Sequence, residues 1–169
     1  MGRTRELEPT QRELVAQYEA LRRFASVVAD SDMDPDDVCQ EAMTRVLLAV
    51  RGGRGPAPSE VGAYARRAIV SVCSNTRRGM ARRSAAVRRA GRTSDEELPM
   101  YPSEVAVLDG IPARARAVLY LQHVEGRTSE EIGAWLGLTA EAVRATASRA
   151  RRRLRVEADS AVAAQEEHR

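Results

Sequence analysis

The sequence predicts an all-α protein built of two small helical domains joined by a flexible linker. Apolar residues recur at three- and four-residue spacing along most of the chain, and no stretch shows the alternation of a strand. A chain of 169 residues is long enough for one ordinary domain or two small ones. Between residues 84 and 108 the helical period is lost and Gly, Pro, Ser and acidic residues gather, which is typical of a linker.

The N-terminal domain is predicted over residues 10–83 and begins with two helical stretches. The stretch 10–29 carries an apolar stripe at helical spacing, formed by Leu14, Tyr18, Leu21, Ala25 and Val28. The stretch 34–50 opens with Asp34 as its N-cap and Pro35 at the first helical position, both favoured at helix starts.

A loop and a third helix complete this domain. The run RGGRGPAPS, residues 51–59, cannot continue a helix. Residues 60–83 are predicted to be helical and to turn an apolar face inward, formed by Val61, Ala65, Ile69 and Val72. The outer face and the end of this helix are expected to carry arginines: Arg66, Arg67, Arg77, Arg78, Arg82 and Arg83.

The C-terminal domain is predicted over residues 109–156, followed by a polar, frayed tail over 157–169. Its centre is TSEEIGAWLGLTAEAVRATASRARRRLR. Thr128 and Glu131 have the spacing of a capping box that starts a short helix. Gly137 is suited to the left-handed residue of a turn.

The residues around that turn favour a second helix. Gly133 is expected where a crossing helix approaches closely, and Leu138 is expected to fill the corner. Thr139 is the expected cap of the second helix, which Val143 and Ala147 would hold to the core.

A short helix, a turn with glycine and a longer basic helix are typical of a helix-turn-helix. The other faces of the second helix carry polar and basic residues: Arg144, Thr146, Ser148, Arg149, Arg151, Arg152, Arg153 and Arg155. Such a helix fits the DNA major groove, where Arg reads guanine through two hydrogen bonds. The alternative is a basic face that serves only solubility, and six Arg against one Glu over residues 139–155 argue against it.

The distribution of charge also indicates nucleic acid. The formal net charge is only +3, and every basic residue except the two His is Arg. Residues 60–94 contain nine Arg and one acidic residue, and residues 139–155 form the second basic block. Because acidic stretches separate the two blocks, we expect two contacts with one polyanion.

Several classes of function are disfavoured. Cys39 and Cys73 stand far apart in apolar helical contexts, so we expect buried thiols, no metal and no cofactor. His123 and His168 have no nucleophile or carboxylate arrangement beside them, so an enzyme is not expected. No apolar run approaches the length of a membrane helix, and no apolar signal core is seen, so a cytoplasmic protein without membrane insertion is expected.

The motifs resemble those of one protein family. GIPARARAVLYLQHVEGRTSEEIGAWLGLTAEAVRATASRARRRLR, residues 110–155, resembles region 4 of bacterial sigma factors. YEALRRFASVVAD, DPDDVCQEAMTRVLLAV and AYARRAIVSVCSNTRRGMARR resemble region 2 of extracytoplasmic-function sigma factors of the sigma-70 superfamily, especially actinobacterial ones. The Arg-only, Ala-rich composition agrees with a high-GC bacterial host.

This resemblance implies a function and partners. It implies a subunit that binds core RNA polymerase at the largest-subunit clamp and the flap region, recognises the promoter −35 and −10 elements and promotes DNA opening. An anti-sigma factor is a further partner that the resemblance allows. The alternative is a helix-turn-helix transcription regulator that does not depend on core polymerase.

The resemblance also implies site residues. The clamp of core polymerase would contact one face of the helix 34–50: Asp37, Gln40, Glu41 and Arg45. The −10 element would meet the third helix at Arg66, Arg67, Ser71, Arg77 and Arg78. The −35 element would meet Arg144 and Thr146, with phosphates held by Ser148, Arg149, Arg151 and Arg152. Because Thr146 stands where many relatives carry Arg, we expect a −35 element that either has an unusual sequence or is read largely by shape.

Overall fold

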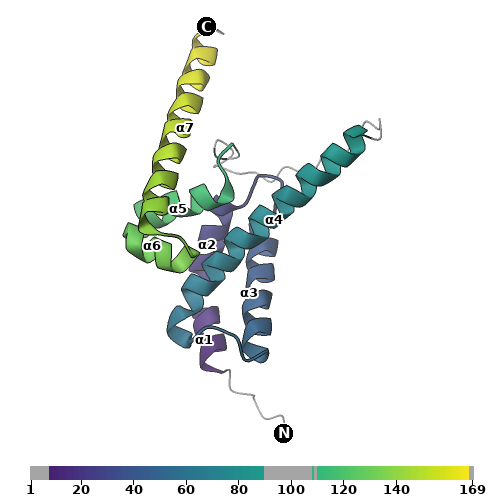
Figure 1. The fold of residues 1–169 in the computed structure, drawn as a ribbon, viewed down its shortest axis with the longest axis vertical. Coiled ribbons are helices and arrows are strands. Elements are labelled where there is room, and N and C mark those ends of the chain that lie inside the picture. Colours follow the sequence, from purple (N-terminus) through teal and green to yellow (C-terminus); the bar gives the residue numbers. More distant parts are fainter. Residues whose placement is uncertain (1–7, 90–107, 109, 168–169) are drawn as a thin grey trace.

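The computed structural model describes the backbone of residues 8–89, 108 and 110–167, and the side chains of residues 8–77, 108 and 110–159. The described residues form helices and contain no strand, which confirms the all-α fold class. The helices, which Figure 1 labels, are α1 (Pro9–Ala16), α2 (Tyr18–Val28), α3 (Pro35–Arg51), the short 3-10 helix η1 (Pro58–Glu60), α4 (Val61–Arg89), α5 (Ala113–His123), α6 (Ser129–Leu136) and α7 (Ala140–Glu167).

The apolar stripe of residues 10–29 is divided between two helices. At Gln17 the backbone has φ −92° and ψ 0°, so α1 ends there and α2 starts anew. Leu14 of α1 and Leu21, Ala25 and Val28 of α2 are buried as predicted, whereas Tyr18 is half-buried. Phe24, which is not in the predicted stripe, is also buried. The helical spacing thus identified four of its five residues as buried, although the chain changes direction between α1 and α2.

The start of α3 is as the sequence predicted. The Asp34 side chain accepts a hydrogen bond from the backbone N–H of Asp36 at 2.8 Å, and Pro35 is the first helical residue. The helix buries Val38, Cys39, Ala42 and Val46 against α4 and α2.

Helices α4 and α7 are longer than predicted. Helix α4 continues through Arg89, so residues 84–89 are helical rather than part of a linker, and the remaining linker residues 90–107 lie outside the described ones. Helix α7 continues to Glu167, so the tail is helical and not frayed over that range. The first extension is rich in Ala and Arg and the second in Ala, Glu and Gln, all of which are good helix formers. Their far ends project from the body of the molecule (Figure 1).

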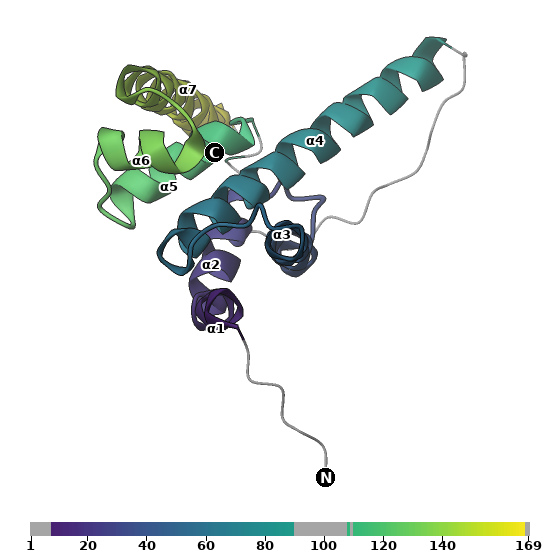
Figure 2. The same cartoon turned by 60° about the horizontal axis from the view of Figure 1, so that its bottom comes forward.

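The two halves of the chain pack directly on each other. Helix α2 contacts α5, and α4 contacts both α5 and α6. The first half of α4 lies between α3 on one side and α5 and α6 on the other (Figures 1 and 2). One apolar cluster runs through both halves, from Phe24 and Ile69 to Leu121, Ile132 and Val143. Each fully buried aliphatic side chain there contributes roughly 1.5–3 kcal/mol, so the contact between halves is part of the core and not a loose tether.

Candidate nucleic-acid interface

The first helix of the helix-turn-helix, α6, begins with a complete capping box, and a left-handed glycine ends it. The Thr128 hydroxyl accepts from the backbone N–H of Glu131 at 3.2 Å, and the Glu131 carboxylate accepts from the backbone N–H of Thr128 at 2.8 Å. This backbone hydrogen bond, together with one from the Arg127 guanidinium, holds the pKa of Glu131 below its usual value. Gly137 has φ 68° and ψ 43°, the left-handed conformation that its position predicted.

Two further residues shape this turn. A Cβ on Gly133 would lie 2.7 Å from the carbonyl oxygen of Leu138, closer than real Cβ contacts. Glycine is therefore required because the backbone of the turn passes here, and not because of a crossing helix as we expected. The Thr139 hydroxyl accepts from the backbone N–H of Ala142 at 3.1 Å, which confirms it as the cap of α7.

Helix α7 is anchored by one apolar face and exposes the others. Val143 and Ala147 are buried at 0% and 1% exposure, as predicted. Thr146 is half-buried, and the exposed side chains are those of Arg144, Ser148, Arg149, Arg151, Arg152, Arg153 and Arg155. The Arg144 guanidinium forms an exposed ion pair with Glu130 of α6 at 3.3 Å. The second helix of the helix-turn-helix therefore exposes six arginines, which give it a strongly basic surface.

The predicted polymerase-binding face of α3 is accessible. Asp37, Gln40 and Glu41 are exposed, and Arg45 is half-buried. The Arg45 Nε donates to the Glu41 carboxylate at 3.0 Å, which orders two of the four side chains.

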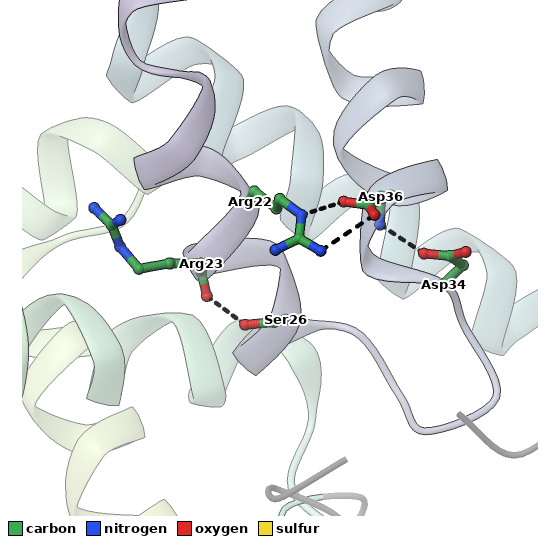
Figure 3. A network of polar contacts seen from close by, with 5 residues as sticks. All are labelled: Arg22, Arg23, Ser26, Asp34 and Asp36. Carbon is green, nitrogen blue, oxygen red and sulfur yellow. Dashed lines mark hydrogen bonds and ion pairs between the residues drawn. The ribbon is translucent and has the colours of Figure 1, made fainter. Parts of the chain in front are cut away.

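The start of α3 is also tied to α2. Arg22 of α2 donates to both carboxylate oxygens of Asp36, beside the Asp34 cap (Figure 3). This carboxylate raises the pKa of Arg22 through a side-chain hydrogen bond and its charge. The contact orients the first turn of α3, from which Asp37 projects.

Arg66 of α4 is not on an outer face, and the prediction that it would be is wrong. Its exposure is 6%, and its guanidinium donates to the Glu125 carboxylate through Nη2 at 2.7 Å and Nε at 3.2 Å. The guanidinium carbon also lies 5.8 Å from the centroid of the Phe24 ring and 5.3 Å from that of the Trp135 ring. Arg66 is buried because α6 covers the side of α4 that we had assigned to solvent.

The other predicted −10 residues are placed differently. Arg67 is exposed, but its guanidinium donates to the backbone carbonyls of Trp135 at 2.8 Å and Ala134 at 3.0 Å. Ser71 and Arg77 are exposed further along α4. Arg78 belongs to α4, and its side chain lies outside the described ones. Arg66 and Arg67 thus contact the C-terminal half of the chain, whereas Ser71 and Arg77 face solvent.

Sequence reasoning missed the acidic partners across the two halves. Glu125 pairs with Arg66, and Asp30 pairs with Arg116, whose side chain is only 1% exposed. The Arg116 guanidinium also donates to the Leu108 carbonyl at 3.4 Å. No local pattern marks these residues, because the partners stand 59 and 86 positions apart.

The cysteines are buried and free, as expected. Burial raises the pKa of the Cys73 thiol to about 12 and also raises that of Cys39. Within the described residues there is no group of three or more His, Cys, Asp or Glu that could hold a metal ion. None of the helices in the described part of the chain combines the length and hydropathy needed to cross a membrane.

The fold and this surface define an all-α protein of the helix-turn-helix class, with a second helix that exposes arginines. The family model of sigma-70, region 4 matches residues 107–156, which include α5, α6 and the first part of α7. The ECF RNA polymerase sigma factor SigE of Mycolicibacterium smegmatis is 28% identical; the match covers 87% of this chain and 61% of that relative's length.

A solved structure shares the fold. The sigma factor RpoE of Bartonella quintana, in complex with the anti-sigma factor NepR, matches with a TM-score of 0.64 at 18% identity, over 90% of this chain and 98% of that one. Over residues 107–156 the chain is thus similar to region 4 of sigma-70 factors, and over most of its length it is similar to a sigma factor of the extracytoplasmic-function group.

Proposed function

We propose that this protein is a promoter-specificity subunit, which binds core RNA polymerase, recognises −35 and −10 elements and promotes DNA opening. The observation that carries the proposal is the row of exposed arginines on α7, held in place by the capped turn and by Val143 and Ala147. The names of the relatives and the match to region 4 support it.

In this proposal the start of α7 reads the −35 element. Arg144 contacts base edges, since it is exposed near the N-terminal end of the recognition helix. Thr146 is half-buried and short, so it adds little direct readout, and DNA shape supplies more of the specificity. The phosphates are held by Ser148, Arg149, Arg151 and Arg152, which position the helix without specifying sequence.

The N-terminal half takes the remaining roles. The exposed face of α3, with Asp37, Gln40, Glu41 and Arg45, binds the clamp of core polymerase through complementary charge. Helix α4 meets the −10 element through Ser71, Arg77 and Arg78 and through Arg66 and Arg67. An anti-sigma factor is a further proposed partner, because the solved relative is bound to one.

The test uses purified protein with core RNA polymerase from a high-GC bacterium and maps transcript starts on a genomic library. Defined starts are expected, and they should vanish when Asp37, Gln40 and Glu41 are changed to Ala. A matched control changes two exposed acids outside α3, Glu19 and Glu60, to Ala and should keep the starts. If no starts appear while the protein alone still shifts duplex DNA, a regulator independent of core polymerase replaces the sigma factor.

A further inference from the structure

We propose that the far end of α4, residues 79–89, makes a second contact with DNA. It binds the phosphates of the duplex that adjoins the −10 element on the side of the −35 element. The inference rests on the proposed function, which assigns the first part of α4 to the −10 element. It goes beyond that function by adding a contact, without sequence preference, to the DNA between the two elements.

The far end of α4 is strongly basic. Residues 79–89 contain four arginines and no acidic residue: Arg82, Arg83, Arg88 and Arg89. The rest of α4 adds four more arginines and again no acidic residue. Like charges four positions apart, such as Arg78 and Arg82, destabilise a helix. A helix of this composition is therefore stabilised when a polyanion such as DNA neutralises it.

Helix α7 provides a comparison within the same molecule, because its far end also projects from the body (Figure 1). The charges of α7 are matched: the Arg153 Nε donates to the Glu157 carboxylate at 3.1 Å. Asp159, Glu166 and Glu167 follow without a further arginine in this helix. Of the two projecting ends, only that of α4 has the charge that a phosphate backbone attracts.

The far end also continues the register of the exposed face of α4. Ser71 and Asn75 are exposed, whereas Ile69 on the opposite side of the helix is fully buried. Arg89 stands about five full turns after Ser71 at 3.6 residues per turn, and Arg82 falls in the same register. The positions of these two arginines, and not only their charges, therefore extend the face that the proposed function assigns to DNA.

The length of α4 determines which DNA its far end reaches. The residues assigned to the −10 element, from Arg66 to Arg78, cover about 18 Å of helix, which is about the length of five base pairs. Arg89 lies about 16 Å further along the same helix, so the far end extends past that element. Because the chain continues from Arg89 to the helix-turn-helix proposed to read the −35 element, we assign this DNA to the interval between the elements.

The experiment uses the full chain with core RNA polymerase and a promoter fragment taken from the mapped transcript starts. The test variant combines Arg82→Gln with Arg89→Gln. The matched control combines Arg12→Gln with Arg23→Gln, which makes the same change in charge at exposed positions of α1 and α2. Affinity for the promoter fragment is measured at several salt concentrations. Circular dichroism verifies that each variant is folded.

The test variant is expected to bind the promoter fragment about tenfold more weakly at about 0.15 M salt. The slope of log K against log salt should fall by about 1.8, because each phosphate contact contributes about 0.9. The control variant should behave like the original protein in both measurements.

A second set of fragments locates the contacted phosphates. Pairs of uncharged methylphosphonate linkages replace neighbouring phosphates, either between the two elements or downstream of the −10 element. A pair between the elements, close to the −10 element, should weaken binding of the original protein and leave the test variant unaffected, because the two changes remove the same contact. Pairs downstream should affect both proteins equally.

Three results would overturn the proposal: unchanged affinity and salt dependence in the test variant, equal sensitivity of both proteins to linkages between the elements, or a loss of affinity for core polymerase instead of DNA. The last result would make the far end of α4 a polymerase contact. Failure of the proposed function looks different. In that case no transcript starts are found with the unsubstituted protein and core polymerase, and both proposals fail together.

Discussion

Arg144 of the recognition helix and Glu130 of α6 form an ion pair across the helix-turn-helix, with 3.3 Å between Nη1 and Oε1. Both side chains are exposed, at 60% and 70%. An exposed pair of this kind contributes less than about 1 kcal/mol to stability. The ion pair matters more for DNA binding, because the Arg144 guanidinium that would contact a base is held by the Glu130 carboxylate.

Glu130→Gln is therefore expected to leave the midpoint of thermal unfolding nearly unchanged and to change the affinity for −35 duplexes. Removal of the competing carboxylate should tighten binding several-fold, on the order of 1 kcal/mol. The measurement is a binding titration on duplexes from mapped promoters. Glu157→Gln, which frees Arg153 in the same way, serves as the control and should not alter sequence preference.

Asp30→Asn should destabilise the protein strongly. It takes the carboxylate away from the Arg116 guanidinium, which is 1% exposed, and breaking a buried pair costs about 3–5 kcal/mol. Urea unfolding gives the free energy. Asp36→Asn is the matched comparison, since its pair with Arg22 has side chains that are 40% and 50% exposed and should cost less than about 1 kcal/mol. Equal losses in the two variants would contradict the importance of burial.

Gly133→Ala should destabilise the helix-turn-helix although alanine is the better helix former. The added Cβ would lie 2.7 Å from the Leu138 carbonyl oxygen, so the turn must shift, at a cost of about 1–3 kcal/mol. Loss of −35 binding should accompany the loss of stability. The reverse change at the exposed neighbour, Ala134→Gly, should cost about 1 kcal/mol or less, through helix propensity alone.

Lowering the pH should remove the contribution of the Glu131 capping box to the stability of the fold. Because the folded-state pKa of Glu131 is lowered, its ionised form stabilises the fold above the unfolded pKa of about 4.3, and this contribution disappears as the pH falls through the folded pKa. Glu131→Gln keeps an acceptor for Thr128 but cannot ionise. The difference in unfolding midpoint between the original protein and this variant should be largest near neutral pH and vanish in strong acid. A difference that persists unchanged in strong acid would contradict the role of the Glu131 carboxylate in the cap.

The native thiols should be almost inert at about pH 8. With the pKa of Cys73 at about 12, its thiolate fraction is roughly a thousandfold below that of an ordinary cysteine. Ellman's reagent should titrate neither Cys39 nor Cys73 in the folded protein and both in guanidinium chloride. A cysteine introduced at the exposed position Glu141 should react at once, and rapid reaction of the native pair would contradict their burial.

The helix-turn-helix could be predicted in detail because its signals are local. Thr128 and Glu131 lie three positions apart, and Gly137 and Thr139 act on the residues beside them. In each case a backbone group needs a hydrogen-bond partner or a special conformation that a residue within a few positions supplies. A short window of sequence therefore contains everything that the prediction needs. The identity of the buried residues followed in the same way from the period of 3.6.

The placement of Arg66 could not be predicted, and the reason is physical. Periodicity identifies one apolar face of a helix, whereas α4 is covered on two sides, by α3 and by α6. On the second side the buried residue is Arg66. Its partner Glu125 comes from the other half of the chain, so no local sequence pattern contains both residues. The lengths of α4 and α7 were underestimated because polar, alanine-rich sequence was interpreted as linker and tail.

Helix α7 runs without interruption from Ala140 to Glu167. At 1.5 Å per residue this is a rod of about 42 Å, of which the first turns carry Arg144. Val143, Ala147 and Ala150 fix the first part of this rod to the core, so a force on its distal end is transmitted to the helix-turn-helix. A partner that binds only the last turns of α7 would thus act on the helix-turn-helix from a distance, through the helix itself.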